Sequence, residues 1–372
     1  MRVVVVGAGI AGTAAALALD MAGFEVSVHE AHPDSGADLG AFLTLPGTGT
    51  RVLDELGLTP TAGFPLTAMR LTDSSGAEVG GSVLDGYRCV RRAELCAELR
   101  AEAHRRGLRV EHGARFVSAE QDGDGVVARF SDGREAEGDL LVGADGLNSA
   151  VRERIDPVPK RYAGQHVFFG HSDRAAPPHR PGRIEMVRGS GSAFGYAVSP
   201  EGRTYWFARV PAPPLDAGES ADDRRARLLR ALEPDETPTA AIVAASDEVL
   251  VTEARDLAQP PRWRDGRVLL IGDAAHAASP ATGQGAAMAL EDAVVLAKAV
   301  RDHGDLDAYE RLRRPRVERN IVRSAQLTAM LGAQHAELPD AVERLERRHR
   351  DAPSTDDPTD LLTWHTPLPT HL

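Results

Sequence analysis

The sequence predicts an α/β protein in which a parallel, doubly wound sheet carries an inserted antiparallel sheet and a C-terminal helix. Two observations predict the parallel sheet: apolar runs at residues 2–6 and 268–271, which lead into a glycine-rich turn and into Gly-Asp. A third predicts the inserted sheet, because residues 160–255 hold several short runs with strand-like alternation. A chain of 372 residues is long enough for two or three domains with substantial cores.

The first thirty residues are predicted as a strand, a glycine-rich turn, a helix and a second strand. The turn is Gly7-Ala8-Gly9-Ile10-Ala11-Gly12, which matches G-x-G-x-x-G, and the helix continues over residues 13–21. The second strand covers residues 26–29 and ends at Glu30. This order of elements is typical of a βαβ unit that binds the ADP half of a dinucleotide.

Each part of this turn has a mechanical reason. Gly7 permits the tight turn, Gly9 lets the backbone approach a pyrophosphate, and Gly12 lets the helix pack closely on the strand. Glu30 is placed to accept hydrogen bonds from an adenosine ribose. The turn does not separate NAD from FAD, because both cofactors present the same ADP half. The residues predicted to bind the cofactor here are Gly7, Gly9, Ile10, Ala11, Gly12 and Glu30.

Residues 31–99 are less regular. Residues 40–45 are predicted as a strand and residues 53–56 as a helix that ends at Gly57. Residues 67–91 contain short alternating runs separated by glycines, which predicts hairpin strands. A helix begins at Arg92, in the pattern Arg-Ala-Glu-Leu-Cys-Ala-Glu-Leu.

A second strand-turn-helix unit follows three short hairpin strands at residues 110–136. A strand at residues 139–144 ends in Ala-Asp-Gly, and a helix opens near Ser149, a good N-cap. Asp145 and Gly146 occupy the turn between strand and helix. The residue pattern leaves two interpretations open: a cofactor-binding turn, and an ordinary β–α turn whose aspartate caps the helix.

No motif in the inserted segment, residues 160–255, indicates a particular substrate. Alternation in residues 203–209 places Tyr205 and Phe207 on one face of a strand and Trp206 on the other. One of these faces is a candidate lining for a substrate cavity, and the competing interpretation is that all three aromatic residues belong to the core. Residues 221–232 are predicted as a helix.

The stretch at residues 267–293 carries the strongest signal. Its strand ends at Gly272 and Asp273, a loop with Pro280 and Gly283 follows, and a helix starts near Gly285. A carboxylate at the carboxyl end of a strand therefore faces a glycine-rich helix N-terminus. Ligands bind at this edge of open α/β sheets, and a helix N-terminus favours a negatively charged or electron-rich group.

These segments, in this order, resemble the motifs of the single-component FAD-dependent aromatic hydroxylases, the family of para-hydroxybenzoate hydroxylase and the tetracycline-inactivating monooxygenases. The resemblance covers about residues 1–330 and implies a Rossmann-like FAD-binding domain with a substrate-binding sheet above the flavin. It implies that Asp273, with Gly272, binds the ribityl chain, and that Asp145 and Gly146 lie by the pyrophosphate. The residues that would line the flavin ring are Pro280, Gly283, Gln284 and Gly285.

Arg92 is the last cofactor-binding candidate from the resemblance. Its position matches an arginine that lies near the ribityl chain and the pyrophosphate in the family, where it could donate a charge-assisted hydrogen bond. Two alternatives stay open at this stage. One is a solvated arginine at a helix start, and the other is that Arg91, one residue earlier, takes the role.

The resemblance implies an FAD-dependent, NAD(P)H-using monooxygenase. Such an enzyme hydroxylates or epoxidises an aromatic or polyketide-like small molecule with dioxygen, through a flavin hydroperoxide. The flavin carries the chemistry, so no metal and no further catalytic side chain is assigned. The alternatives are a flavin-dependent dehydrogenase or halogenase on the same fold, and a flavin-binding protein without turnover. Trp206, Trp263 and Trp364 are isolated and do not form the tryptophan-rich motif of the halogenases.

The predicted domains are discontinuous. The FAD-binding domain takes residues 1–70, 88–158 and 256–303, and the substrate-binding domain takes residues 71–87 and 159–255. A helical C-terminal segment covers residues 304–350, with the long helix at 306–330. Residues 351–372 are rich in Pro, Thr and Asp and are predicted to be a weakly ordered tail.

The composition of the chain argues against several classes of binding partner. The net charge of −12 argues against a nucleic acid or an anionic membrane surface. No apolar stretch reaches the roughly 18 residues of a membrane span. Cys89 and Cys96 are too few for a disulfide framework and have no neighbours for a zinc site. We expect a cytoplasmic monomer or homodimer whose partners are a small-molecule substrate and dioxygen.

Overall fold

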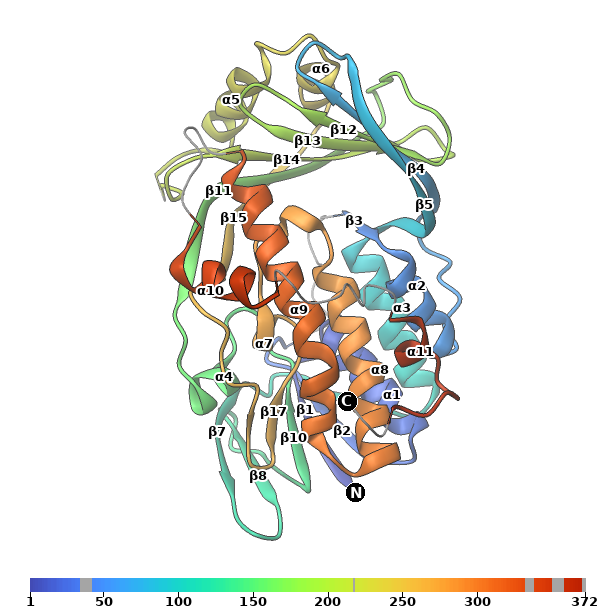
Figure 1. Ribbon diagram of the computed structural model, residues 1–372, viewed down its shortest axis with the longest axis vertical. Helices are drawn as coiled ribbons and strands as arrows, with labels where there is room; N and C mark the ends of the chain where they lie inside the picture. Colours follow the sequence, from blue (N-terminus) through green and yellow to red (C-terminus); the bar gives the residue numbers. More distant parts are fainter. Residues whose placement is uncertain (34–41, 217, 332–337, 350–357, 370–372) are drawn as a thin grey trace.

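The computed structural model describes residues 1–33, 42–216, 218–331, 338–349 and 358–369. Figure 1 shows a nucleotide-binding domain at the bottom and a large sheet that crosses above it. Long helix α9 (Leu306–Ala329) runs from the first to the second. The predicted α/β class, with an inserted antiparallel sheet and a C-terminal helix, is confirmed.

The nucleotide-binding domain is built on a six-stranded sheet with β1 near its centre. Strand β1 pairs in parallel with β2 and β10, and β10 pairs in parallel with β17. The valines of β1 are at most 3% exposed, as expected for a strand covered on both faces. In sheet order the strands are β16 (Arg264–Asp265), β17 (Val268–Leu270), β10 (Leu140–Gly143), β1 (Arg2–Val6), β2 (Glu25–His29) and β6 (Val110–Glu111).

Helices gather around the sheet through small side chains. Helix α1 (Ile10–Met21) packs against α8 (Gly285–His303) and α3 (Arg92–Arg105), and α8 also contacts α2 (Gly47–Glu55) and α9. The alanines at the centres of α1 and α8 are buried, and their small side chains let the two helices approach closely. This contact joins the helices that follow the first and the last predicted cofactor motifs.

A small antiparallel sheet and helix α4 (Ala150–Ile155) extend the same domain. The sheet contacts β1 and β10, and the ring of His29 stacks on Phe130 with centroids 4.4 Å apart. These contacts bury the end of β2 that carries Glu30. The sheet consists of β7 (Phe116–Gln121), β8 (Val126–Phe130) and β9 (Glu135–Gly138).

The upper sheet has eight strands from two separate parts of the chain. Its pairs are antiparallel except for β12 with β4, which are parallel. Helices α5 (Ala221–Leu232) and α6 (Thr239–Ala244) lie above it in Figure 1. In sheet order the strands are β15 (Val249–Leu257), β11 (Lys160–Ser172), β14 (Thr204–Pro211), β13 (Ala193–Val198), β12 (Arg183–Arg188), β4 (Phe64–Asp73), β5 (Glu78–Arg91) and β3 (Phe42–Leu45).

The aromatic residues of β14 divide between the two faces of the upper sheet. Trp206 stacks on Phe194 with centroids 5.5 Å apart and belongs to the core beneath α5 and α6. Tyr205 and Phe207 lie on the opposite face, where both contact Phe42 of β3. We call these the outer and the inner face. The alternation expected from the sequence is therefore present, and the inner face is directed toward the nucleotide-binding domain.

The C-terminal segment is tied to both domains. Near the end of α9, the Thr328 carbonyl accepts a 2.8 Å hydrogen bond from Gln165 of β11. Helix α10 (Asp340–His349) packs on α9, and α11 (Thr359–Leu362) contacts α2 and α8. These contacts place α9 beside both sheets.

Part of the predicted weakly ordered tail packs on the protein. Residues 358–369 bury Leu362, Trp364 and Leu368 against the main core. The Lys298 ammonium donates to the carbonyl oxygens of residues 361 and 363, both at 2.7 Å. Composition did not reveal these contacts, because three apolar side chains suffice to anchor a segment that is otherwise polar. Residues 351–357 and 370–372 lie outside the described residues.

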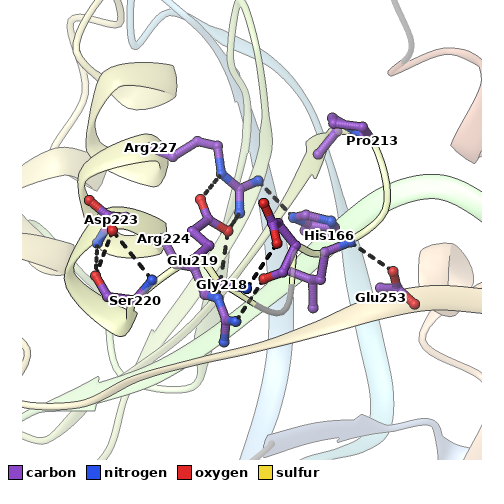
Figure 2. Close-up of polar contacts among 12 residues, drawn as sticks. His166, Pro213, Gly218, Glu219, Ser220, Asp223, Arg224, Arg227 and Glu253 are labelled. Carbon is purple, nitrogen blue, oxygen red and sulfur yellow. Dashed lines mark hydrogen bonds and ion pairs between the residues drawn. The ribbon is translucent and has the colours of Figure 1, made fainter.

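A polar cluster on the outer face couples β11 to α5 (Figure 2). His166 is 1% exposed, and its Nδ1 lies 2.7 Å from an Arg227 amino group, so the neutral ring accepts a hydrogen bond there. Arg227 also donates to both carboxylate oxygens of Glu219, at 2.9 and 3.0 Å. Burial and the charge of Arg227 lower the pKa of His166, outweighing the opposite effect of the Pro213 backbone and of the charges of Glu253 and Glu219.

This cluster predicts a contribution to pH-dependent stability. Because the folded state lowers the pKa of His166 below its ordinary value of 6.5, the unfolded chain binds a proton first on acidification. The contribution of His166 to the free energy of unfolding is therefore fully present above pH 6.5, and it falls as the pH drops below 6.5. We expect His166→Gln to make urea unfolding less steeply dependent on pH between 7 and 5, by at most about 1.4 kcal/mol per pH unit.

The matched control is His104→Gln, at an exposed position of α3. That variant is expected to follow the wild-type pH profile. Parallel profiles for the wild type and the His166 variant would contradict the assignment.

Candidate active site

Three turns meet at the carboxyl edge of the parallel sheet. They follow β1, β10 and β17, whose strands are neighbours in parallel register. A Cβ built on Gly7 would lie 2.5 Å from the Ala144 carbonyl oxygen, and one on Gly272 would lie 2.8 Å from the Ala11 Cβ. The predicted first motif therefore touches both the other motifs, and glycine is required at both contacts.

The first turn has the geometry expected from its glycines. Gly7 has φ of 102°, and a Cβ on Gly12 would lie 1.8 Å from the Gly7 carbonyl oxygen. Among the described residues, no atom lies within 4 Å of a Cβ built on Gly9. No side chain caps the N-terminus of α1, where Gly9 is the N-cap. The space at Gly9 and the backbone N–H groups of the first turn are thus suited to a phosphate.

Glu30 holds the first turn from the end of β2. One carboxylate oxygen accepts from the Ala8 N–H at 2.7 Å, and the other accepts from the His32 N–H at 2.9 Å. Each oxygen keeps a second lone pair, because a carboxylate has about four acceptor sites. The side chain is half-buried at the same edge as Gly9. This position suits the predicted contact with a ribose.

The segment after β17 is more regular than the predicted loop. Gly272 turns the chain with φ of 58°, and two short helices follow, α7 (Asp273–His276) and η1 (Pro280–Thr282). Gly283 has φ of 68°, and α8 begins at Gly285. The predicted start of this helix is therefore where the structure has it.

Asp273 is exposed although its chain neighbours Gly272 and Ala274 are buried. A Cβ built on Gly285 would lie 4.0 Å from a carboxylate oxygen of Asp273. The carboxylate thus lies across the N-terminus of α8, as expected from the sequence. Pro280, Gly283 and Gly285 are exposed beside it, and Gln284 is half-buried.

The carboxylate of Asp145 caps helix α4. It accepts hydrogen bonds from the N–H groups of Ala150 at 2.8 Å and Val151 at 3.1 Å, and from the Ser149 hydroxyl. Burial raises the pKa of Asp145 despite these bonds. Of the two interpretations left open by the sequence, the capping role describes the side chain. The Asp145 backbone lies 3.0 Å from a Cβ built on Gly7, so the turn itself borders the first motif.

Arg152 of α4 is buried beside the turns, whereas Arg92 is exposed at the start of α3. Arg152 is 1% exposed and donates to the carbonyl oxygens of Ala274, at 3.2 Å, and Leu147, at 2.7 Å. It therefore links the turn after β10 to α7. Arg92 is exposed at the first residue of α3, whereas Arg91 makes a 3.5 Å contact with Glu94. Arg92 remains the candidate of the two.

A buried ionic network, which the sequence did not reveal, supports the loop of Asp273. Asp292 of α8 accepts from the Gly272 N–H at 2.9 Å and from Arg313 of α9 at 2.8 Å, and its oxygen lies 2.6 Å from Nε2 of His276. Burial raises the pKa of Asp292, but His276 and Arg313 outweigh it and hold the value at about 2.

Glu291 completes this network. It accepts from Arg313 at 2.6 Å and from two nitrogens of Arg316, both at 2.7 Å. Burial raises the pKa of Glu291, and the charges of Arg313 and Arg316 lower it further than burial raises it. Both acids and Arg313 are fully buried. The available signal was the Glu-Asp pair on the apolar, packed helix α8, together with the basic run 313–316.

Together these features define a class of protein. It has a dinucleotide-binding fold, carboxylates of Glu30 and Asp273 at the carboxyl edge of the parallel sheet, and the upper sheet above that edge. The chain belongs to the family described as FAD binding domain, which matches residues 1–324. It is an FAD-dependent monooxygenase, and its family typically draws electrons from NAD(P)H. The sequence-based predictions of family, cofactor and enzyme class are thereby confirmed.

Similar proteins cover nearly the whole chain. The aurachin C monooxygenase/isomerase of Stigmatella aurantiaca is 33% identical over 340 residues, which span 86% of each chain. The FAD-dependent urate hydroxylase of Klebsiella pneumoniae is 34% identical over 346 residues, 88% of this chain and 89% of the relative. The crystal structure of Klebsiella pneumoniae HpxO with FAD and uric acid matches with a TM-score of 0.82, at 31% identity over 93% of both chains.

Within the described ranges, every helix is too short or too polar to cross a lipid bilayer.

The ionic network predicts a large effect of Arg313→Met. The substitution leaves the carboxylates of Glu291 and Asp292 buried without their shared partner, so we expect a loss of about 3–5 kcal/mol in unfolding free energy. The loop of Asp273 should loosen with it and FAD should dissociate more readily. Urea unfolding and FAD retention on gel filtration measure the two effects.

The control is Arg347→Met, which removes an exposed pair with Glu343. A surface pair contributes about 0–1 kcal/mol. Equal losses in the two variants would show that the network does not constrain the fold.

Proposed function

We propose that this monooxygenase inserts one oxygen atom into an aromatic or polyketide-like small molecule bound between the flavin and the inner face of the upper sheet. The main support is that the three turns meet below the inner face of the upper sheet, which presents Tyr205 and Phe207. The named activities of the relatives, on urate and on aurachin C, support a ring-containing substrate. NAD(P)H is the proposed reductant, as is typical of the family.

The residues present fit FAD. Space at Gly9 and the uncapped N-terminus of α1 suit the pyrophosphate, and Glu30 stands where a ribose would be. Exposed Asp273 suits a ribityl hydroxyl at the start of α8. When bound, FAD supplies the activation of dioxygen and the transfer of one oxygen atom. The other proposed contacts come from Ile10, Ala11, Arg92, Asp145, Gly146 and Gly272.

The protein's own residues orient the ring and exclude water. Pro280, Gly283, Gln284 and Gly285 form the proposed edge against the isoalloxazine, because they border the exposed carboxylate of Asp273. Above them, the ring of Phe42 lies 5.8 Å from Phe207 and 6.1 Å from Tyr205. This aromatic wall would hold a flat substrate and keep bulk water from the oxygen-transferring atom.

The proposed setting is a cytoplasmic monomer or homodimer with no nucleic-acid partner. Its support is the chain's net charge of −12 and the state of its two cysteines, which are buried and form no disulfide. Burial, with a small effect of Glu94, raises the pKa of the Cys89 thiol, so that this group stays protonated and unreactive.

Isotope labelling tests the function. Purified protein with FAD, NAD(P)H and a panel of aromatic and polyketide compounds is supplied with labelled dioxygen. We expect a product heavier by one labelled oxygen atom, with one NAD(P)H oxidised for each product formed. A product that carries oxygen from water, or steady NAD(P)H oxidation without any oxygenated product across the panel, would contradict the proposal.

Asp273→Ala tests the cofactor site. The Asp273 side chain is exposed, so its removal should leave the fold of the FAD-free protein intact. A charge-assisted hydrogen bond to the ribityl chain contributes about 1.5–3 kcal/mol, so FAD should bind about 10- to 100-fold more weakly. Fluorescence titration of FAD measures the change.

Asp124→Ala is the control, because Asp124 is exposed in the hairpin between β7 and β8. Unchanged FAD affinity in a folded Asp273 variant would remove this residue from the site.

A further inference from the structure

Arg209 is a charged residue on the inner face of the upper sheet. Its chain neighbours Ala208 and Val210 belong to the core of the outer face. Alternation along β14 therefore puts Arg209 on the same side as Phe207, which contacts Phe42. The side chain is directed toward the nucleotide-binding domain, and no part of the cofactor site described above includes it.

The guanidinium of Arg209 is buried, and the described residues supply no counter-charge for it. Arg209 is 8% exposed, and burial alone lowers its pKa to about 10. In the part of the chain that the structure describes, its Nη1 has no hydrogen-bond partner and no carboxylate pairs with it. A buried cation without a partner is costly, because the interior does not replace the water it has lost.

Three other arginines are held by protein partners. Arg313 is held by Asp292 and Glu291, and Arg152 donates to two carbonyl oxygens. On the outer face of the same sheet, Arg227 is bound to Glu219 and His166 (Figure 2). Arg152 keeps its Nε unpaired but is bonded through its other two nitrogens. Arg209 differs from these three residues, because no described residue forms a hydrogen bond or an ion pair with its guanidinium. A ligand that supplies the missing partner is the simplest physical reason.

A chain of contacts connects the strand position of Arg209 to the residue that precedes the flavin-lining loop. In the sheet, Arg209 is paired with Val167 of β11, and Gln165 lies on the same face two residues earlier. Gln165 donates to the Thr328 carbonyl, and the Thr328 hydroxyl lies 2.6 Å from that of Ser279. Ser279 directly precedes Pro280, so a short chain of contacts links the strand position to the loop.

We propose that Arg209 is a specificity-determining residue that binds an anionic oxygen of the substrate, a carboxylate or an ionised phenol or enol. This inference rests on the proposed function, which places a ring-containing substrate under the inner face. The anion would take the place of the absent counter-charge, and its two-point contact with the planar guanidinium would fix the orientation of the ring over the flavin. Neutral analogues would leave the cation unpaired.

Matched ligand pairs test this in the FAD-loaded protein. 4-Hydroxybenzoate is compared with 4-hydroxybenzamide, and salicylate with salicylamide, by the change in flavin absorbance on binding. For the second source of anion, 4-nitrophenol in mild alkali is compared with 4-nitroaniline. We expect the wild type to bind the anionic member of at least one pair about 10- to 100-fold more tightly, and Arg209→Gln to abolish that preference.

Arg230→Gln, an exposed position on α5, removes the same charge and should keep the preference. Equal affinities for the anionic and neutral members in the wild type would overturn the proposal. So would a preference that survives in the Arg209 variant, or one that is lost equally in the Arg230 variant. Because binding is measured without turnover, a protein that binds anions but forms no oxygenated product would refute only the proposed function.

Thermal stability gives an independent measurement that does not require a ligand to be found. If the partner of Arg209 is the substrate, then Arg209→Met removes an unpaired buried charge from the substrate-free protein. The melting temperature of that protein should then be unchanged or higher. An arginine with a structural role would lower it. A lower melting temperature in this variant, with Arg230→Met unchanged, would overturn the proposal even if no compound of the panel binds.

Discussion

The buried carboxylate of Asp292 is the constraint on which the cofactor site depends. It contacts the Gly272 N–H, the His276 ring and the Arg313 guanidinium at 2.9, 2.6 and 2.8 Å. A carboxylate in the interior is tolerated only when its oxygens are paired, so these partners are fixed together. The end of β17, the turn after it and α9 consequently hold one relative position. The place of Asp273 follows, because it is the residue next to Gly272.

Glycine sets the second constraint, the close approach of the turns. A side chain at Gly272 would meet Ala11, and one at Gly7 would meet the Ala144 carbonyl. The cofactor edge is therefore made mostly of backbone, whose N–H groups suit phosphate oxygens. Such an edge tolerates little change in the protein and little change in the ligand. This explains why the segments around it were recognisable from residue types and spacing alone.

The sequence predicted what depends on local pattern, and it missed what depends on pairing across the fold. The βαβ unit, the start of α8 and the division of Tyr205 and Phe207 from Trp206 follow from spacing and alternation. The sequence could not decide that Asp145 caps α4, because capping and cofactor turns share the same residues there. Nor could it pair Glu291 and Asp292 with Arg313, since these residues lie on two different helices, α8 and α9.

The two sheets differ in how far their residues are constrained. We propose that the inner face of the upper sheet borders the substrate, while the outer face carries the packing beneath α5 and α6. Because alternate residues of one strand serve the two purposes, an inner side chain can change while Trp206 and its neighbours keep the sheet folded. Substrate choice can thus vary within the family without disturbing the FAD edge. Arg209 on that face is the kind of residue that such freedom permits, since we propose that its charge is compensated by the bound substrate.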